Sequence, residues 1–467
     1  MVVVANSLQQ LRPTSDIYRV LAGKTAIIGS QLAAMAIFQS ASVTSGQQRE
    51  VKPPATPKIG RLAYLDALRA IAILAVIAFH LGKDWGLNSA GAPLMPYGGA
   101  IAENNVVRFG HYGVELFFII SGFVIALSLE RCVGWRDFAV RRFARLWPAL
   151  ILCTFLTWMV TNLLASAETP GPPLVDSIPA ITLVPPTFWH LLGWGSAGYM
   201  DPSLWSLWVE ILFYALAAAL YFNNRAKFLR RLMISACVMW VVRMAAVSYA
   251  LSSTAQANGS SEWVSNAIAL FPLSEFIWWF VFGAALYSLK IKRDKKLAAF
   301  TAGLAVIAQL SASLHSYPAR YETPRQTITM ALIVFALFVT VAFIPLISRV
   351  FSWRPLTKFG EGSYSSYLIH QGIGLALIAA LARWLHLSGT ASLVLVPVVA
   401  ALVIVFGTYL QHAWEKPAQR WVLKRFAPRQ SAPKQRDPAA PEPTSIAPNS
   451  PSPESTSADT ASIPRAC

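Results

Sequence analysis

The chain has 467 residues, of which 55% are hydrophobic and only 13% are charged. Soluble globular domains carry about 25% charged residues, so this composition excludes a wholly soluble protein and places most of the chain in lipid. The net charge of +17 could suggest a nucleic-acid partner, but we expect none because the basic residues cluster between apolar segments. Such clusters indicate topology, and they suit anionic membrane lipid or a phosphate-bearing ligand.

Residues 1–60 contain one mildly apolar run, Ala26–Phe38. This run is too short and too polar for a span, and no small-residue cleavage site follows it at once, which disfavours a cleaved signal. We interpret the region as a cytoplasmic N-terminal extension with at most one surface helix.

Ten later segments have the length and apolarity needed to cross a bilayer core, about 20 residues at a rise of about 1.5 Å each. They lie near 65–82, 112–130, 146–165, 204–222, 232–252, 266–289, 297–314, 327–348, 364–383 and 391–412. We therefore predict an all-α protein, a polytopic membrane helix bundle of about ten transmembrane helices over residues 61–425. The fourth, sixth and ninth segments are the ones that carry polar residues.

Lys and Arg gather in alternate loops, after the second, fourth, sixth and eighth segments and again after the tenth. The loop after the third segment instead carries Glu168, Asp176 and Asp201. Because short basic loops stay in the cytoplasm, we expect both termini there, in a multi-pass protein of the bacterial inner membrane. Arg320 and Arg325 are the main exceptions to the alternation.

The first segment carries a polar stripe of Asp66, Arg69 and His80. Arg69 and His80 are almost three helical turns apart, so both project from one face with about 16 Å between them. Arg69 could instead reach back to the headgroups, and His80 could be an ordinary interfacial histidine. Two such residues on one face of a span favour a functional role.

This segment, "YLDALRAIAILAVIAFH", resembles the opening of the integral-membrane acyltransferase-3 family, whose first span typically has an arginine followed by a histidine at this spacing. The next apolar stretch, "GVELFFIISGFVIALSLER", is similar to the family's second motif and contains Glu115 and Ser121. Glu115 could also pair with His111, one turn before it.

Before the third segment, "FAVRRFARLWPAL" is similar to the family's Arg-x-x-Arg element, with Arg142 and Arg145. We expect Pro148 to open the third helix. The two arginines could simply enforce topology. They could also hold the phosphates of coenzyme A, because a guanidinium group binds phosphate oxygens in a bidentate geometry.

Two further motifs lie in the fourth and ninth segments. "SLWSLWVEILFYAL" is similar to a family element and contributes Trp205, Ser206 and Glu210, although Ile211 stands where the family often has a second acidic residue. "GEGSYSSYLIHQ" is similar to its Ser-Tyr-x-x-Tyr-x-x-His element, and "EKPAQRW" to its closing motif.

The resemblance covers roughly residues 60–425 and implies an O-acyltransferase. It would move an acyl group, which we expect to be acetyl, from cytoplasmic acyl-CoA to a hydroxyl of an exported or cell-surface glycan, lipid-linked sugar or related acceptor. In this interpretation His80 is the catalytic base, oriented by Glu115 or Glu210. Direct transfer and an acyl-histidine intermediate are both open. Arg69, Arg142 and Arg145 would bind the donor, and the supporting or substrate-binding residues would be Asp66, Ser121, Trp205, Ser206, Tyr367 and His370.

A membrane transporter or flippase of glycans or lipids is the alternative, since it too would bury Arg, Glu and His. The histidine spacing and the Arg-x-x-Arg element favour the acyltransferase, and a passive scaffold gives no reason for charge inside the spans.

Residues 426–467 are rich in Pro, Ser and Ala, which predicts a disordered cytoplasmic tail. The four cysteines, Cys132, Cys153, Cys237 and Cys467, show no paired or metal-ligand spacing. We expect no metal.

Overall fold

The computed structural model describes residues 62–83, 94–166, 169–195, 197–291, 293–315 and 323–427, and the secondary structure within these ranges is entirely helical. Nine of the described helices are long and apolar enough to cross a membrane, or ten when one bent pair is taken as a single span. The predicted all-α bundle of about ten spans is therefore confirmed. The predictions for residues 1–60 and for the tail beyond Ala427 concern residues outside these ranges.

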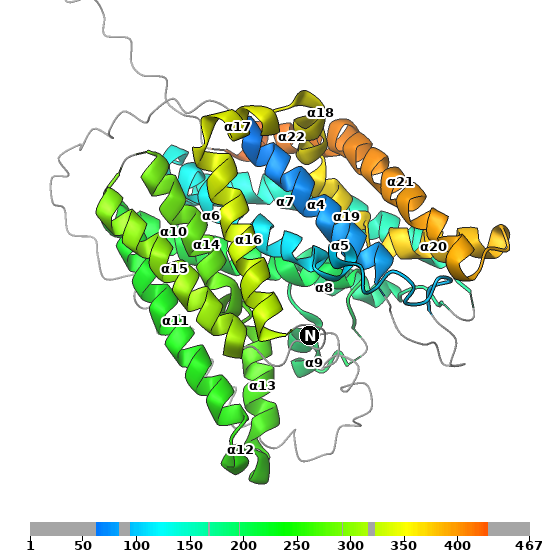
Figure 1. Ribbon diagram of the computed structural model, residues 1–467, viewed down its shortest axis with the longest axis horizontal. Coiled ribbons are helices and arrows are strands. Elements are labelled where there is room, and N and C mark those ends of the chain that lie inside the picture. Colours follow the sequence, from blue (N-terminus) through cyan, green and yellow to red (C-terminus); the bar gives the residue numbers. More distant parts are fainter. Residues whose placement is uncertain are drawn as a thin grey trace, which may run out of the picture. The chain divides into compact units, whose positions relative to one another are not determined.

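The helices follow one another along the chain as Figure 1 shows. Their bounds are α4 Ala63–Gly82, α5 Asn105–Arg108, η1 Gly110–Tyr112, α6 Gly113–Arg131, α7 Trp135–Leu163, η2 Leu174–Asp176, α8 Ser177–Thr182, α9 Pro186–Leu191, η3 Pro202–Leu204, α10 Trp205–Asn223, η4 Arg225–Lys227, α11 Phe228–Ala250, α12 Ser253–Ala257, α13 Ser260–Leu270, α14 Leu273–Lys290, α15 Lys295–His315, α16 Pro324–Phe343, α17 Pro345–Phe351, α18 Arg354–Glu361, α19 Ser363–Ile369, α20 Gly372–Trp384, η5 Gly389–Val394, α21 Leu395–Leu410, η6 Gln411–Glu415 and α22 Lys416–Phe426.

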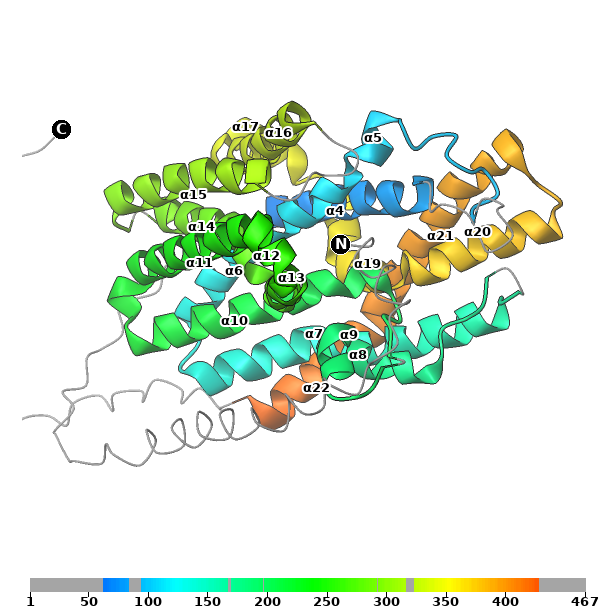
Figure 2. The ribbon, with the colours of Figure 1, turned by 90° about the horizontal axis from the view of Figure 1, so that it is seen from below.

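The first span, α4, packs against α6, α16, α17, α18, α19 and α21, and Figure 2 shows it between these helices in the second view. The approach of α18 is especially close, because a Cβ added at Gly360 would lie 1.6 Å from the carbonyl oxygen of Asp66. Only glycine permits such contact between two backbones. The polar stripe of α4 is therefore held inside the bundle, with Asp66 buried and Arg69 and His80 partly exposed.

The helices α6 and α14 cross through two glycines. A Cβ at Gly122 would lie 2.1 Å from the carbonyl oxygen of Phe280, and one at Gly283 would lie 2.0 Å from that of Ile119. Small residues at such a crossing let membrane helices pack backbone to backbone. This contact fixes the position of Ser121, the neighbour of Gly122.

The expectation that Pro148 opens the third helix is wrong. The helix α7 begins at Trp135 and runs through Pro148 to Leu163. Pro148 has no N–H to donate within the helix. Its carbonyl accepts a hydrogen bond from the Trp414 indole at 2.8 Å. Arg142 and Arg145 therefore project from a helix rather than from a loop.

The ninth span is broken, whereas the sequence predicted a continuous segment over 364–383. The helices α19 and α20 meet at an angle of 57°. At the break, the backbone N–H of Gly372 donates to Asp201 Oδ2 at 2.9 Å, so a side chain supplies the acceptor that a straight helix would take from its own backbone. The break follows His370 immediately.

Candidate active site

A cavity of about 290 Å³ lies among α4, α6, α7, α10 and α19. Its wall combines phenylalanines and aliphatic residues with three arginines, one carboxylate and several hydroxyl groups. The polar members of this wall are Arg69, Arg142, Arg145, Ser121, Ser206, Glu210, Tyr214, Ser363, Tyr364 and Tyr367. Residues predicted from five separate segments of the sequence therefore meet around one space.

Arg69 and Arg142 each have a hydrogen-bonding partner. Arg69 pairs with Asp66 on the same helix at 2.8 Å. Arg142 donates to Ser128 Oγ at 2.8 Å and lies over the Phe138 ring, 5.4 Å from its centroid. The Nε of Arg142 is buried with no hydrogen-bond partner in the described part of the chain. Arg142 therefore has donor capacity that an anion in the cavity could use.

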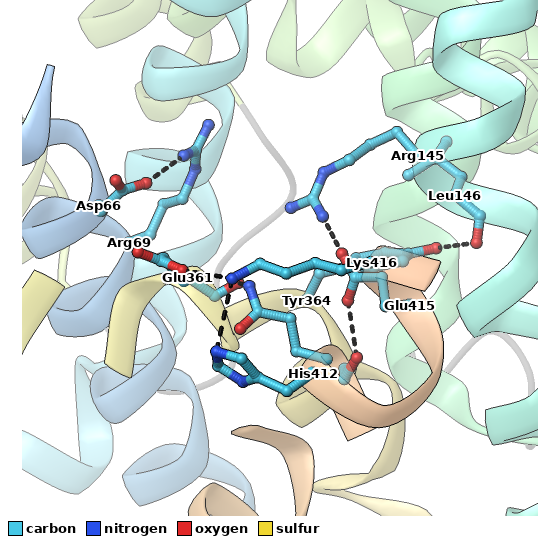
Figure 3. A network of polar contacts seen from close by, with 11 residues as sticks. Asp66, Arg69, Arg145, Leu146, Glu361, Tyr364, His412, Glu415 and Lys416 are labelled. Atoms are coloured by element: carbon cyan, nitrogen blue, oxygen red, sulfur yellow. Dashed lines mark hydrogen bonds and ion pairs between the residues drawn. The ribbon is translucent and has the colours of Figure 1, made fainter. Parts of the chain in front are cut away.

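Arg145 pairs with a carboxylate from the opposite end of the sequence. Glu415 accepts from Arg145 and, through its other oxygen, from Ser365 Oγ at 2.8 Å. The guanidinium also lies over the Tyr364 ring, 5.3 Å from its centroid. Figure 3 shows this pair facing the Arg69 side of the site, above a second ion pair between Lys416 and Glu361.

Glu415 is the last residue of the π-helix η6. The sequence motif that contains it gave it no role, and its partner 270 residues away could not be inferred from spacing. Single π-turns of this kind are frequent at functional sites because they redirect a side chain. Here the π-turn places a buried carboxylate against Arg145.

Glu210 accepts hydrogen bonds from Ser121 Oγ at 2.6 Å and from the Tyr214 hydroxyl at 2.7 Å. Both partners line the cavity, and the role of orienting His80 stays a prediction. Glu210 holds the carboxylate charge that faces the arginines.

His80 and His370 contact each other, although 290 residues separate them in the sequence. His80 Nδ1 lies 3.0 Å from His370 Nε2 and 3.0 Å from the carbonyl oxygen of Val76. His370 Nδ1 lies 2.6 Å from the carbonyl oxygen of Tyr367. The site therefore contains a histidine pair joined to two main-chain carbonyls.

The partners of the pair fix the tautomers of two neutral rings. A carbonyl oxygen only accepts, so each Nδ1 facing one must carry the ring proton. His370 Nε2 then holds a lone pair, and the single Nδ1–H of His80 is shared between this lone pair and the carbonyl oxygen of Val76. The lone pair of His80 is consequently on Nε2, which is the arrangement that a general base requires.

Tyr367 connects the histidine pair to the cavity. Its ring lines the cavity, its carbonyl binds His370, and its hydroxyl donates to the carbonyl of Ser203 at 2.8 Å and lies 2.7 Å from Ser206 Oγ. The histidines themselves do not line the cavity. We call the region of Arg69, Arg142 and Arg145 the arginine end and that of the two histidines the histidine end.

Sequence reasoning missed Asp201 and Ser203, which hold the histidine end together. Asp201 is 1% exposed, and its Oδ1 accepts from the backbone N–H and the hydroxyl of Ser203 at 2.9 and 2.6 Å. Its Oδ2 accepts from Gly372 at the helix break. The Asp-Pro-Ser sequence before α10 suits this turn, because Asp caps a helix with proline at its first position.

Two predicted residues lie beside the cavity without lining it. Glu115 is half-buried in the first turn of α6. Trp205 begins α10, where its ring packs against Phe276 and Phe118 with centroids 5.2 and 6.4 Å apart. His111, which could pair with Glu115 by its spacing, has its ring tilted against that of Tyr112, with centroids 4.4 Å apart.

Two connecting segments each bury a hydrogen-bonded polar side chain. In the first, the buried Tyr97 hydroxyl donates to the carbonyl of Leu81, next to His80. Burial raises the pKa of Tyr97 and so keeps this hydroxyl a neutral donor. In the second, burial also raises the pKa of Asp176, and the Gly198 N–H that donates to it at 2.6 Å partly opposes this effect.

A family model described as an acyltransferase domain, acyltransferase-3, matches residues 62–412. The chain belongs to the acyltransferase-3 family. The matched range contains every predicted site residue. Among the described residues of this chain, no three His, Cys, Asp or Glu side chains are grouped to hold a metal ion.

Known acyltransferase-3 relatives share only parts of their length with this chain. "Acyltransferase MdmB" of Streptomyces mycarofaciens is 30% identical over 161 residues, which are 34% of this chain and 38% of the relative. "Putative peptidoglycan O-acetyltransferase YrhL" of Bacillus subtilis is 32% identical over 160 residues, 32% of this chain and 22% of the relative. The chain therefore matches less than half of the length of either protein. No solved structure matches the chain.

Proposed function

We propose that the protein is an integral-membrane O-acyltransferase that moves an acetyl group from acetyl-CoA to a hydroxyl of an exported or cell-surface glycan, lipid-linked sugar or related acceptor. The observation that carries the proposal is the position of Tyr367. It lines the arginine-walled cavity and binds the histidine pair, so that a donor site and a base are adjacent.

The arginine end would bind the phosphates of the donor. Guanidinium groups suit phosphate oxygens because they present parallel donors. The basic loops favour a cytoplasmic position for this end, on the side where acyl-CoA is made. A cavity of about 290 Å³ is at the small end for ligand pockets. It therefore suits the narrow acyl-bearing arm, while the nucleotide stays at the cytoplasmic entrance.

The histidine end would perform the transfer. His80 Nε2 takes the proton of the acceptor hydroxyl as its oxygen attacks the thioester carbonyl. The C–S bond then breaks, and the protonated His80 returns its proton to the leaving thiolate. Ser206 lies at the cavity wall, where its hydroxyl could stabilise the oxyanion of the intermediate.

His370 would orient the base. Its Nε2 lone pair accepts from His80 Nδ1–H, and this hydrogen bond strengthens when His80 becomes positively charged. The neutral imidazole of His370 would thereby fix the tautomer of His80. In a serine protease a carboxylate does this for the catalytic histidine.

The test uses the purified chain in nanodiscs with acetyl-CoA labelled in the acetyl group and an envelope extract. We expect label in a glycan or lipid-linked fraction, with equimolar release of free thiol. Saturable transport of an unmodified glycan or lipid with no thiol release would contradict the proposal and favour a transporter.

A further inference from the structure

A second cavity, of about 340 Å³, lies away from the candidate active site at the break between α16 and α17. Its wall includes two cations, two hydroxyl groups and two apolar rings: Lys290, Arg349, Ser348, Ser352, Phe343 and Pro345. None of them lines the active-site cavity.

The position of this cavity corresponds to the headgroup layer of a membrane. Lys290 is the last residue of one candidate span, and Phe343 is the last residue of another. Both helices therefore end at this cavity. A ligand bound here would lie where lipid phosphates are found.

The two cations at this cavity have no carboxylate partner among the described residues. Lys290 Nζ donates to the carbonyl of Ala342 at 2.6 Å and lies 5.2 Å from the centroid of the Phe343 ring. Arg293, three residues later, instead pairs with Glu130 at 2.9 Å. The charge of Lys290 and Arg349 is therefore left for a ligand.

The surface around the cavity is apolar. Leu346 and Val350 on α17 are 70% and 65% exposed, and no residue of this helix is buried. Ile344, at the break, is 44% exposed. In a membrane such residues face acyl chains, whereas a site for a soluble phosphate has no use for them.

We propose that this cavity binds the phosphate headgroup of an anionic phospholipid, with its acyl chains against Leu346 and Val350. Lys290 and Arg349 supply the charge complementarity, and Ser348 and Ser352 supply hydroxyl groups beside it. Basic pockets between spans at the cytoplasmic surface are suited to such headgroups. The inference does not depend on the acyltransferase activity.

The test is native mass spectrometry of the full chain, released from detergent and titrated with phosphatidylglycerol or phosphatidylcholine of identical acyl chains. We expect one phosphatidylglycerol to be retained more tightly than any phosphatidylcholine. Arg349→Gln and Lys290→Gln should each weaken its binding about fivefold, and the double variant about thirtyfold, because each cation near an anionic surface contributes about 1 kcal/mol.

Arg425→Gln is the matched control, because Arg425 is exposed on α22 and outside the cavity. It should bind phosphatidylglycerol as the wild type does. Arg349 is also exposed, so its variant should fold normally. Equal retention of the two lipids, an unchanged double variant, or equal losses in Arg425→Gln and Arg349→Gln would overturn the proposal. Binding of glycerol phosphate as tightly as of the lipid would assign the cavity to a soluble phosphate instead.

Discussion

The arginine end and the histidine end of the site differ in how their polar groups are balanced. At the arginine end, Arg69 and Arg145 each have a carboxylate partner, and Arg142 has a hydroxyl and a ring. At the histidine end, two imidazoles bind main-chain carbonyls and each other. The first arrangement can exchange a protein anion for a ligand anion, and the second fixes a proton position. In the proposed mechanism, donor binding and chemistry are therefore separated along α4.

The largest effect is expected at the histidine end. Replacing the base, His80→Ala, should lower the rate of transfer by about 10³-fold or more, since general-base catalysis contributes about 10²–10⁴-fold. Insertion should be unchanged, because a small apolar residue suits the helix. Rates of label transfer at saturating acetyl-CoA check this, with nanodisc yield as the measure of insertion. Wild-type transfer by this variant would remove His80 from the mechanism.

His370→Ala should lower kcat by about 10²-fold with little change in KM for acetyl-CoA, because the tautomer of His80 is no longer fixed. His370→Gln should recover part of kcat, since its side-chain oxygen can accept from His80 Nδ1–H. The control is His412→Ala, an exposed histidine at the arginine end. A purely structural role for His370 would instead give equal losses in the Ala and Gln variants, together with lower thermal stability.

At the arginine end we expect a smaller effect, on KM rather than on kcat. Arg142→Gln should raise KM for acetyl-CoA about tenfold with kcat nearly unchanged, which corresponds to about 1.4 kcal/mol for a charge-assisted contact. Steady-state kinetics against donor concentration measure this. Arg136→Gln, an exposed change near the start of the same helix, α7, should have no effect. Equal shifts in both variants would indicate a general surface field rather than a donor site.

The smallest effect is expected at Tyr214, which donates to Glu210 beside Arg142. Tyr214→Phe removes one hydrogen bond and keeps the ring over which Arg142 lies. A hydrogen bond to a carboxylate contributes about 1.5–3 kcal/mol, but this one would act on the donor only through Glu210 and Arg142. We therefore expect KM for the donor to change by about threefold or less. The same kinetic assay applies, and a loss in kcat as large as that of His370→Ala would assign Glu210 to the chemistry.

The spans could be predicted from sequence because their signal is local. Apolarity over about 20 residues and the alternation of basic loops both depend on near neighbours. The breaks could not be predicted in this way. The bend after His370 depends on Asp201, a residue 171 positions away from the amide it binds, and no periodicity within the ninth segment contains that information.

The site was predicted in part for the same reason. Spacing placed Arg69 and His80 on one face of α4, and the motifs supplied the arginines of α7. The partners of these residues could not be predicted, since His80 and His370 are 290 residues apart in the sequence and Arg145 and Glu415 are 270 apart. For Glu210 the sequence indicated a carboxylate among apolar neighbours, but only packing shows that Ser121 and Tyr214 bind it.

The most direct test asks whether donor binding and acyl transfer are separated between the two ends of the site. Both are measured in the same nanodisc preparations of wild type, His80→Ala and Arg142→Gln. Calorimetric titration gives the Kd for acetyl-CoA, and label transfer gives the rate. We predict that His80→Ala binds the donor as the wild type does and transfers nothing. We predict that Arg142→Gln binds about tenfold more weakly and transfers normally at saturation. Loss of binding in His80→Ala, or loss of saturated transfer in Arg142→Gln, would contradict the division of the site into two ends.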